Sequence, residues 1–267
     1  MTTLKEFLSN KLNKKELSLV PTSFDIVGDI AIFNKFPKEL NNKEKLIGNT
    51  LVRLNKNIKI VAVKSKAYSG KLRLPKLKII AGENRKETIH KENGIKLKLD
   101  VEKCYFSSRL GTERLRIAQL VKNKEKVLVL FSGVAPYPCV ISKNSKAKEI
   151  YGIELNKIAH KYALENLKLN KINNIKLFLG DVKKVLPKIK EKFDRIIMPL
   201  PKDSPAYLTQ TLKKLKLQGT IHLYLFSEEK DFNKLINKYK KKFKSAKLIK
   251  CGAYSPRVYR VCLDLKN

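Results

Sequence analysis

The amino-acid sequence predicts an α/β fold in which a mainly parallel sheet is flanked by helices, preceded by a smaller α+β domain. Three observations predict it. From about residue 100 onward, apolar strand-like runs alternate with helical runs, and this alternation ends in two consecutive strand-like runs. The first hundred residues instead follow a strand-rich pattern. With 267 residues, 43% of them hydrophobic, the chain is long enough for two modest domains with packed cores.

The first domain, residues 1–99, is expected to be built around antiparallel strands. Its strand-like runs are SFDIVGDIAIF, IKIVAVKS and KLRLPKLKIIAG, with a helix predicted from about residue 43 to 54 between the first two. The runs ETIHK and IKLKLD follow, separated by ENG, in which Asn93-Gly94 is a typical hairpin turn.

The second domain, residues 100–267, is expected to carry the parallel sheet. The predicted strands are residues 126–131, 148–154, 174–180, 193–200 and 219–227. Helical spacing indicates helices over TERLRIAQLV, over residues 156–170, after the Ser-Pro pair at residue 204, and over EEKDFNKLINKYKKKF. The last two runs, SAKLIKCGAY and RVYRVCLDL, have no helix between them, so they predict an antiparallel edge.

The charge of the chain favours a polyanionic partner. Lys and Arg total 59 against 24 Asp and Glu, which leaves a formal net charge of +35. Nucleic acid is the first candidate and an anionic membrane surface the second, although lysine-rich surfaces also occur in heat-adapted proteins. No apolar run of about 18 residues predicts a membrane span, and the N-terminus does not read as a signal peptide. We therefore expect RNA or DNA as the partner, and a cytoplasmic protein.

The cysteines and histidines predict no metal site. Cys104, Cys139, Cys251 and Cys262 form no C-x-x-C pair and have no histidine nearby in the sequence. His90, His160 and His222 are also isolated, and we interpret them as ordinary surface or core residues.

One segment predicts a cofactor site. FSGVAPY, residues 131–137, follows the first strand of the second domain, where Gly133 permits close backbone approach. Glu154 ends the next strand and Asp181 follows the third, at positions suited to a ribose and an adenine amino group. Because no G-x-G-x-x-G is present, this arrangement fits S-adenosylmethionine better than a dinucleotide. A purely structural strand-to-helix turn is the alternative interpretation of the loop alone.

The sequence also resembles the archaeal and eukaryotic tRNA (guanine-37, N1)-methyltransferase family. The resemblance rests on FDIVGDIAIF, IAGENRKETIHKENGIKLKLDVEKCYFSSRLGTERLRIA, FSGVAPY, ENLKLN and DRIIMPLPK, and spans residues 23–267. It implies a Rossmann-like class I methyltransferase sheet, S-adenosylmethionine as cofactor, and the anticodon arm of tRNA as partner of a monomeric enzyme. The family's extra N-terminal module is expected to be missing, since only some 20 residues precede the shared part.

The resemblance assigns two catalytic residues. Glu113 of GTER matches the family's general base, which would remove the proton from guanine N1. Arg73 of KLRLPK matches the arginine that would stabilise negative charge on guanine O6. Taken alone, Glu113 is equally an acid favoured by a helix N-terminus, and Arg73 a basic strand residue.

The resemblance, together with the loop, also implies a set of cofactor-contacting positions. Simple core packing is the alternative interpretation of Tyr105. The set consists of Tyr105, Arg114, Phe131, Gly133, Glu154, Leu155, Asp181, Val182 and Pro199.

The sequence departs from the family pattern at three positions. Val129 stands where the family has an acid, and Ala135 where it has a second glycine. Pro199 stands where the family has the asparagine of Asn-Leu-Pro, so this position offers neither a side-chain amide nor an N–H group.

These features lead to one main hypothesis and two alternatives. The main hypothesis is a tRNA methyltransferase that acts on guanine N1 at position 37. The first alternative is a wyosine-pathway enzyme that methylates or aminocarboxypropylates a tricyclic base at position 37, which Pro199 favours. The second is a non-catalytic RNA-binding module with a degenerate cofactor site.

Overall fold

The computed structural model describes residues 3–70 and 72–267 and divides the chain into two compact units. The first comprises Met1–Lys91 and Leu97–Ser108, and the second Glu92–Lys96 and Arg109–Asn267. The boundary between residues 99 and 100 stays a prediction. None of the described helices is long and apolar enough to cross a membrane.

The first unit is built on a four-stranded sheet of order β1-β2-β3-β4, in which only the β2–β3 pair is parallel. Helix α3 packs on it, and the core includes Leu8, Phe33 and Ile47, all fully buried. The elements are α1 (Leu4–Leu8), α2 (Lys14–Leu19), β1 (Asp25–Val27), β2 (Ile30–Phe33), η1 (Lys38–Lys43), α3 (Glu44–Leu54), β3 (Ile60–Ser69) and β4 (Leu74–Gly82).

A separate hairpin follows the four-stranded sheet. It consists of β5 (Glu87–Glu92) and β6 (Ile95–Asp100). Asn93 and Gly94 form its turn with φ of 45° and 78°, the left-handed geometry that a two-residue hairpin requires. The predicted Asn-Gly hairpin is therefore confirmed.

The second unit contains a seven-stranded sheet of order β12-β13-β11-β10-β7-β8-β9. From β11 to β9 neighbouring strands are parallel, while β13 pairs antiparallel with both β11 and β12. The α/β prediction of a parallel sheet with an antiparallel edge is confirmed. The strands are β7 (Lys126–Leu130), β8 (Glu149–Glu154), β9 (Ile175–Leu179), β10 (Phe193–Met198), β11 (Leu215–Glu228), β12 (Ser245–Ser255) and β13 (Val258–Lys266).

The strand order creates one topological switch point. The chain runs from β7 outward through β8 to β9, and then returns to place β10 on the other side of β7. Ligands of open α/β sheets bind beyond the carboxyl ends of the strands at such a point. The predicted cofactor loop follows β7, and Pro199 follows β10, so both lie at this edge.

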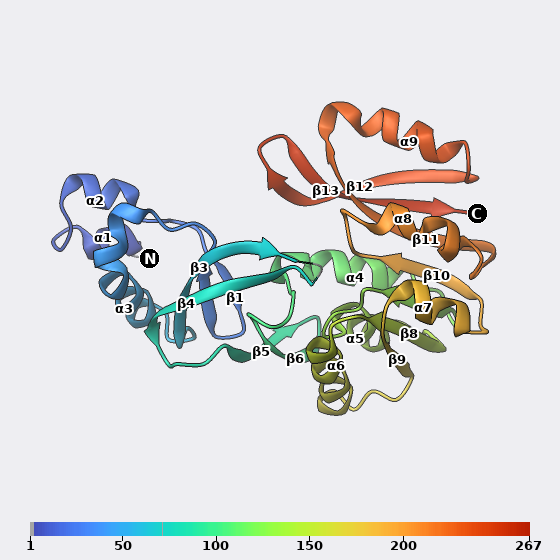
Figure 1. Ribbon diagram of the computed structural model, residues 1–267, viewed down its shortest axis with the longest axis horizontal. Helices are drawn as coiled ribbons and strands as arrows, with labels where there is room; N and C mark the ends of the chain where they lie inside the picture. The colour runs from blue at the N-terminus through green and yellow to red at the C-terminus, as the bar shows by residue number, and fades with distance from the viewer. Residues whose placement is uncertain (1–2, 71) are drawn as a thin grey trace. The chain divides into compact units, whose positions relative to one another are not determined.

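Helices cover both faces of the second sheet, and Figure 1 shows α9 beside β12. One face carries the main apolar core, which joins alternate strand residues such as Leu128, Ile196 and Leu223 to α7, α8 and α9. Helices α5 and α6 contact β8 and β9, and α4 packs on α5. The bounds are η2 (Ser108–Leu110), α4 (Gly111–Leu120), α5 (Pro136–Asn144), α6 (Lys157–Leu169), α7 (Val182–Val185), η3 (Leu186–Lys188), α8 (Ser204–Leu212), η4 (Glu229–Asp231) and α9 (Phe232–Lys240).

Candidate functional site

The loop after β7 has an unusual backbone. Phe131, Gly133 and Ala135 have φ of 54°, 57° and 64°, so three of its five residues are left-handed and two of these are not glycine. Such conformations cost about 1 kcal/mol or more and cluster where proteins hold ligands. Ala135 thus occupies a conformation that favours the family's glycine, and Pro136 then begins α5.

Glu154 ties this loop to the end of β8. Its Oε2 accepts the N–H of Gly133 at 2.7 Å, and its Oε1 accepts the N–H of Asn156 at 2.7 Å. Burial raises the pKa of Glu154, against the opposing effect of these backbone donors. The N–H of Leu155 is a third backbone donor to this carboxylate. The two oxygens together offer about four acceptor sites, so the group can still accept from ribose hydroxyls. Leu155, half-buried, follows directly.

Asp181 stands at the corresponding place after β9. It caps α7, and its Oδ1 accepts the N–H of Lys183 at 2.9 Å. Gly180 before it has a φ of 144°, and Val182 after it is buried in the main core. Two carboxylates therefore end two neighbouring parallel strands beside the left-handed loop. This donor and acceptor set fits the ribose and adenine of S-adenosylmethionine.

The turn after β10 is braced by a buried serine. The hydroxyl of Ser204 donates to the carbonyl of Met198 at 2.8 Å and accepts the N–H of Leu200 at 3.3 Å. Pro199 lies half-buried between them. The ring of Phe131 packs edge-on against Tyr207 of α8, with 5.0 Å between the ring centroids.

Glu113 lies in the first turn of α4 and is 7% exposed. Arg116 holds it with two hydrogen bonds of 2.7 Å, from Nε to Oε2 and from Nη2 to Oε1. The hydroxyl of Tyr224 on β11 also donates to Oε1, at 2.5 Å. The carboxylate is therefore fixed in one orientation by donors from two elements.

Arg114, which is predicted to contact the cofactor, forms two contacts within the second unit. Its guanidinium forms a two-bond ion pair with Glu92 at the hairpin tip, with Nε 2.5 Å from Oε1, and it is 2% exposed. The same guanidinium lies 5.9 Å from the ring centroid of Tyr137 on α5. Arg114 thus braces α4 against the hairpin tip.

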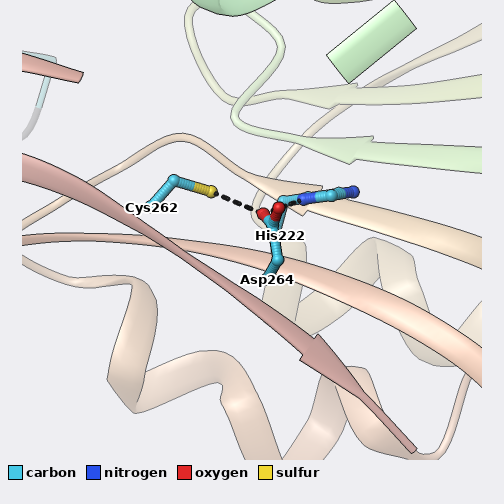
Figure 2. A group of neighbouring side chains, drawn as sticks. All are labelled: His222, Cys262 and Asp264. Carbon is cyan, nitrogen blue, oxygen red and sulfur yellow. Dashed lines mark hydrogen bonds and ion pairs between the residues drawn. The ribbon is translucent and has the colours of Figure 1, made fainter. Parts of the chain in front are cut away.

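His222, Cys262 and Asp264 form a group with metal-ligand chemistry, which Figure 2 shows meeting at the Asp264 carboxylate. Asp264 Oδ1 lies 2.6 Å from His222 Nδ1 and 3.3 Å from Cys262 Sγ. These ligand atoms already have partners, because Arg116 also donates to Asp264 and Arg195 lies 2.6 Å from His222 Nε2. With two guanidiniums against it, the group is a poor cation site.

His222 and Cys262 therefore differ from their interpretation as isolated residues. The pairing of β11 with β13 places His222 opposite Asp264 and Tyr224 opposite Cys262. Sequence reasoning missed these residues, together with Arg116 and Arg195.

Arg73 and Tyr105 belong to the first unit, whereas the other predicted site residues belong to the second. Arg73 lies in the turn between β3 and β4 with a φ of 51°, and its N–H donates to the carbonyl of Gly70 at 3.1 Å. Tyr105 is half-buried in the segment between β6 and η2.

Comparisons with known proteins identify relatives over nearly the whole chain. Residues 88–250 match the TRM5/TYW2 methyltransferase domain, and residues 4–85 match the TYW2 N-terminal domain. The tRNA (guanine(37)-N(1))-methyltransferase Trm5b of Pyrococcus abyssi is 41% identical over 255 residues, which cover 92% of this chain and 75% of the relative. The tRNA (guanine(37)-N(1))/4-demethylwyosine(37)-methyltransferase Taw22 of Nanoarchaeum equitans is 34% identical, over 80% of this chain and 87% of the relative.

A solved structure shares the fold of the chain. It is described as the complex structure of aTrm5 and tRNALeu, and it matches with a TM-score of 0.87 and 34% identity. The match covers 99% of this chain and 78% of that one.

Proposed function

The chain belongs to the TRM5/TYW2 methyltransferase family, and we propose that it transfers a methyl group from S-adenosylmethionine to N1 of guanine at position 37 of tRNA. The observation that carries this proposal is the left-handed loop after β7, which Glu154 ties to the end of β8 at the switch point. The names of its relatives agree with this activity.

In this proposal the carboxyl ends of the parallel strands hold the cofactor. Glu154 accepts from the ribose hydroxyls and Asp181 from the adenine amino group. Gly133 lets the backbone approach closely, and Phe131, Leu155, Val182 and Pro199 line the site. Bound there, S-adenosylmethionine supplies an electrophilic methyl group on its sulfonium.

Glu113 is the general base of the proposed reaction. As the bond between guanine N1 and the methyl carbon forms and the bond from carbon to sulfur breaks, the N1 proton must leave. Arg116 and Tyr224 hold this carboxylate in one orientation, and its Oε2 would accept that proton. Arg73 would stabilise the negative charge on O6, and Tyr105 would contact the cofactor.

The proposed partner is the anticodon arm of tRNA, held through its phosphates by a chain of net charge +35. A base in a single-stranded loop can be splayed out without opening a duplex. We assign residues 1–99 to the RNA side and expect a cytoplasmic enzyme that acts as a monomer.

Product analysis tests the proposal. Purified protein, labelled S-adenosylmethionine and unmodified tRNA transcripts with G or A at position 37 are incubated, and the nucleosides are then separated. N1-methylguanosine from the G37 transcript alone is expected. Bound cofactor without this product would refute the proposed acceptor, and no cofactor binding would instead favour an RNA-binding module.

Pro199 supports a second candidate, a wyosine-pathway activity on a tricyclic base at position 37. The proline removes the amide and the N–H that the family's asparagine offers, and Taw22 is named for both substrates. The same assay with tRNA carrying 4-demethylwyosine separates the two activities. If the second candidate is correct, Pro199→Asn lowers activity on the tricyclic base; if the proline only weakens the first activity, this change raises methylation of G37.

A further inference from the structure

Strand alternation separates apolar from polar residues on one half of the second sheet. On β11, Ile221 and Leu223 belong to the main apolar core, while His222 and Tyr224 face the other way. Asp264 on β13 alternates with core residues in the same manner. The polar side chains of both strands thus gather on the face where α4 presents Glu113 and Arg116.

We call this group the sheet-face cluster. It is a continuous chain of hydrogen bonds and ion pairs formed by Glu113, Arg116, Asp264, His222, Arg195 and Glu125.

Arg116 is shared between two carboxylates. Besides its two bonds to Glu113, its Nη1 lies 2.7 Å from Asp264 Oδ2 and its Nη2 lies 3.3 Å from Asp264 Oδ1. Burial raises the pKa of Asp264, but His222 and Arg116 outweigh it, so this pKa lies well below its ordinary value and the carboxyl is ionised.

His222 is a neutral link in the cluster. A guanidinium can only donate, so His222 Nε2 accepts from Arg195 and Nδ1–H donates to Asp264. Burial lowers the pKa of His222, which agrees with the neutral ring. Arg195 in turn donates to Glu125 with Nε at 2.8 Å, which anchors the far end.

The cluster has one more negative charge than positive. Glu113, Asp264 and Glu125 are three carboxylates, while Arg116 and Arg195 are two guanidiniums, and three minus two leaves one negative charge. The other titratable side chains that face the cluster add no net charge. Burial raises the pKa of two phenols and two thiols, which stay neutral: Tyr137, Tyr224, Cys251 and Cys262. The positive charge of Arg114 is balanced by its ion pair with Glu92. One added proton would therefore neutralise the cluster.

We propose that Asp264 is a positioning residue that lets Glu113 take up the substrate's proton, by keeping Arg116 paired when Glu113 becomes neutral. This inference rests on the proposed function. In an isolated buried ion pair, protonation of the acid leaves an unpaired cation in the interior, which is strongly unfavourable. Here Asp264 remains as the counter-ion of Arg116, so Glu113 is both fixed in place and a competent base.

The N1–H bond breaks as the methyl group moves from sulfur to N1, and the proton passes to Oε2 of Glu113. Tyr224 and Arg116 continue to orient the neutral carboxyl, and release of the proton to solvent restores the cluster for the next turnover.

Asp264→Asn tests the proposal, because asparagine keeps an acceptor for His222 but removes the charge. Glu113 then becomes the sole counter-ion of Arg116 and holds its ionised form more tightly, which makes it a weaker base. We expect the single-turnover methylation rate to fall about tenfold on its plateau. The acid limb of its pH profile should move to lower pH, and the KM values for tRNA and S-adenosylmethionine should not change.

Glu149→Gln is the matched control. Glu149 is also a carboxylate shared by two cations, Lys126 and Lys176, but it lies at the start of β8 and outside the cluster. This variant should keep the wild-type rate and pH profile. Two results for Asp264→Asn would refute the positioning role. One is a lower methylation rate without a shift of the acid limb of the pH profile, and the other is an acid limb that moves to higher pH.

A second measurement is independent of catalysis. The side-chain carboxyl carbon of Glu113, assigned by comparison with Glu113→Gln in ¹³C-glutamate-labelled protein, should titrate at lower pH in Asp264→Asn than in the wild type. An unchanged or higher midpoint overturns the inference even if the wild type methylates no G37. If instead the midpoint falls but no N1-methylguanosine forms, the proposed function alone has failed.

Discussion

The ion pair between Arg114 and Glu92 gives the sharpest stability prediction. Glu92→Gln keeps the shape of the side chain but removes the charge that faces a guanidinium only 2% exposed. Two charge-assisted hydrogen bonds are weakened, and the new amide group can direct N–H donors at a group that only donates. Removing one partner of a buried ion pair typically costs about 3–5 kcal/mol.

Urea unfolding followed by circular dichroism measures this cost. With a slope of about 2 kcal/mol per molar urea, a loss of 3 kcal/mol lowers the midpoint by about 1.5 M. Glu83→Gln is the control, since Glu83 pairs with Arg85 at the surface and its side chain is 57% exposed, so its loss costs about 1 kcal/mol or less. A Glu92→Gln midpoint no lower than that of the control would refute the assignment of a bracing role.

Three further predictions follow from the site. Glu154→Ala should weaken S-adenosylmethionine binding at least tenfold in calorimetry, since hydrogen bonds to a charged group contribute about 1.5–3 kcal/mol each; unchanged affinity would place the ribose elsewhere. Ala135→Gly removes the backbone strain of an alanine in the left-handed region and should raise the melting temperature by a few degrees. The greater entropy of glycine in the unfolded state offsets part of this gain. A lower melting temperature would contradict the presence of strain at Ala135. Hydrogen bonds from Lys176 and Lys126 lower the pKa of Glu149 to about 2, below its unfolded value of about 4.5. The stability from this pair is thus present above about pH 4.5 and lost as pH falls through about 2, so Glu149→Gln and wild type should differ in urea midpoint at pH 7 and converge near pH 2.

The sequence predicted the strands of the second unit closely because their apolar runs are bounded by turns and helices. The predicted strand at residues 193–200 corresponds to Phe193–Met198, and that at 174–180 to Ile175–Leu179. Strand β11 begins at Leu215, four residues before the predicted strand, because Lys216 and Gln218 interrupt the apolar pattern there.

Two short helices near the N-terminus were not predicted. Helices α1 and α2 have five and six residues, too few to show an apolar period. Each begins with a capping box, Thr3 with Glu6 and Asn13 with Glu16. That signal was present in the sequence and would have located both helices.

Local sequence patterns likewise predicted one part of the candidate site and missed another. Glu154 and Gly133 were assigned to one cofactor site because both follow strands of the parallel sheet. The structure joins them by a 2.7 Å hydrogen bond, while their contacts with the cofactor stay predictions. The sheet-face cluster was not predicted. Alternation marks His222 and Asp264 as residues off the apolar face, but the register that pairs β11 with β13 is absent from the local pattern.

The position of the sheet-face cluster along the chain has a consequence for folding kinetics. The contact of Arg116 with Asp264 closes a loop of 148 residues, whereas β7, β8 and β9 are joined by short connections. Long-range pairings form slowly because loop-closure entropy is lost before contacts compensate for it. The environment of Glu113 should therefore be completed last, after β11 and β13 have paired, and a refolding chain should regain secondary structure before it regains methyl transfer.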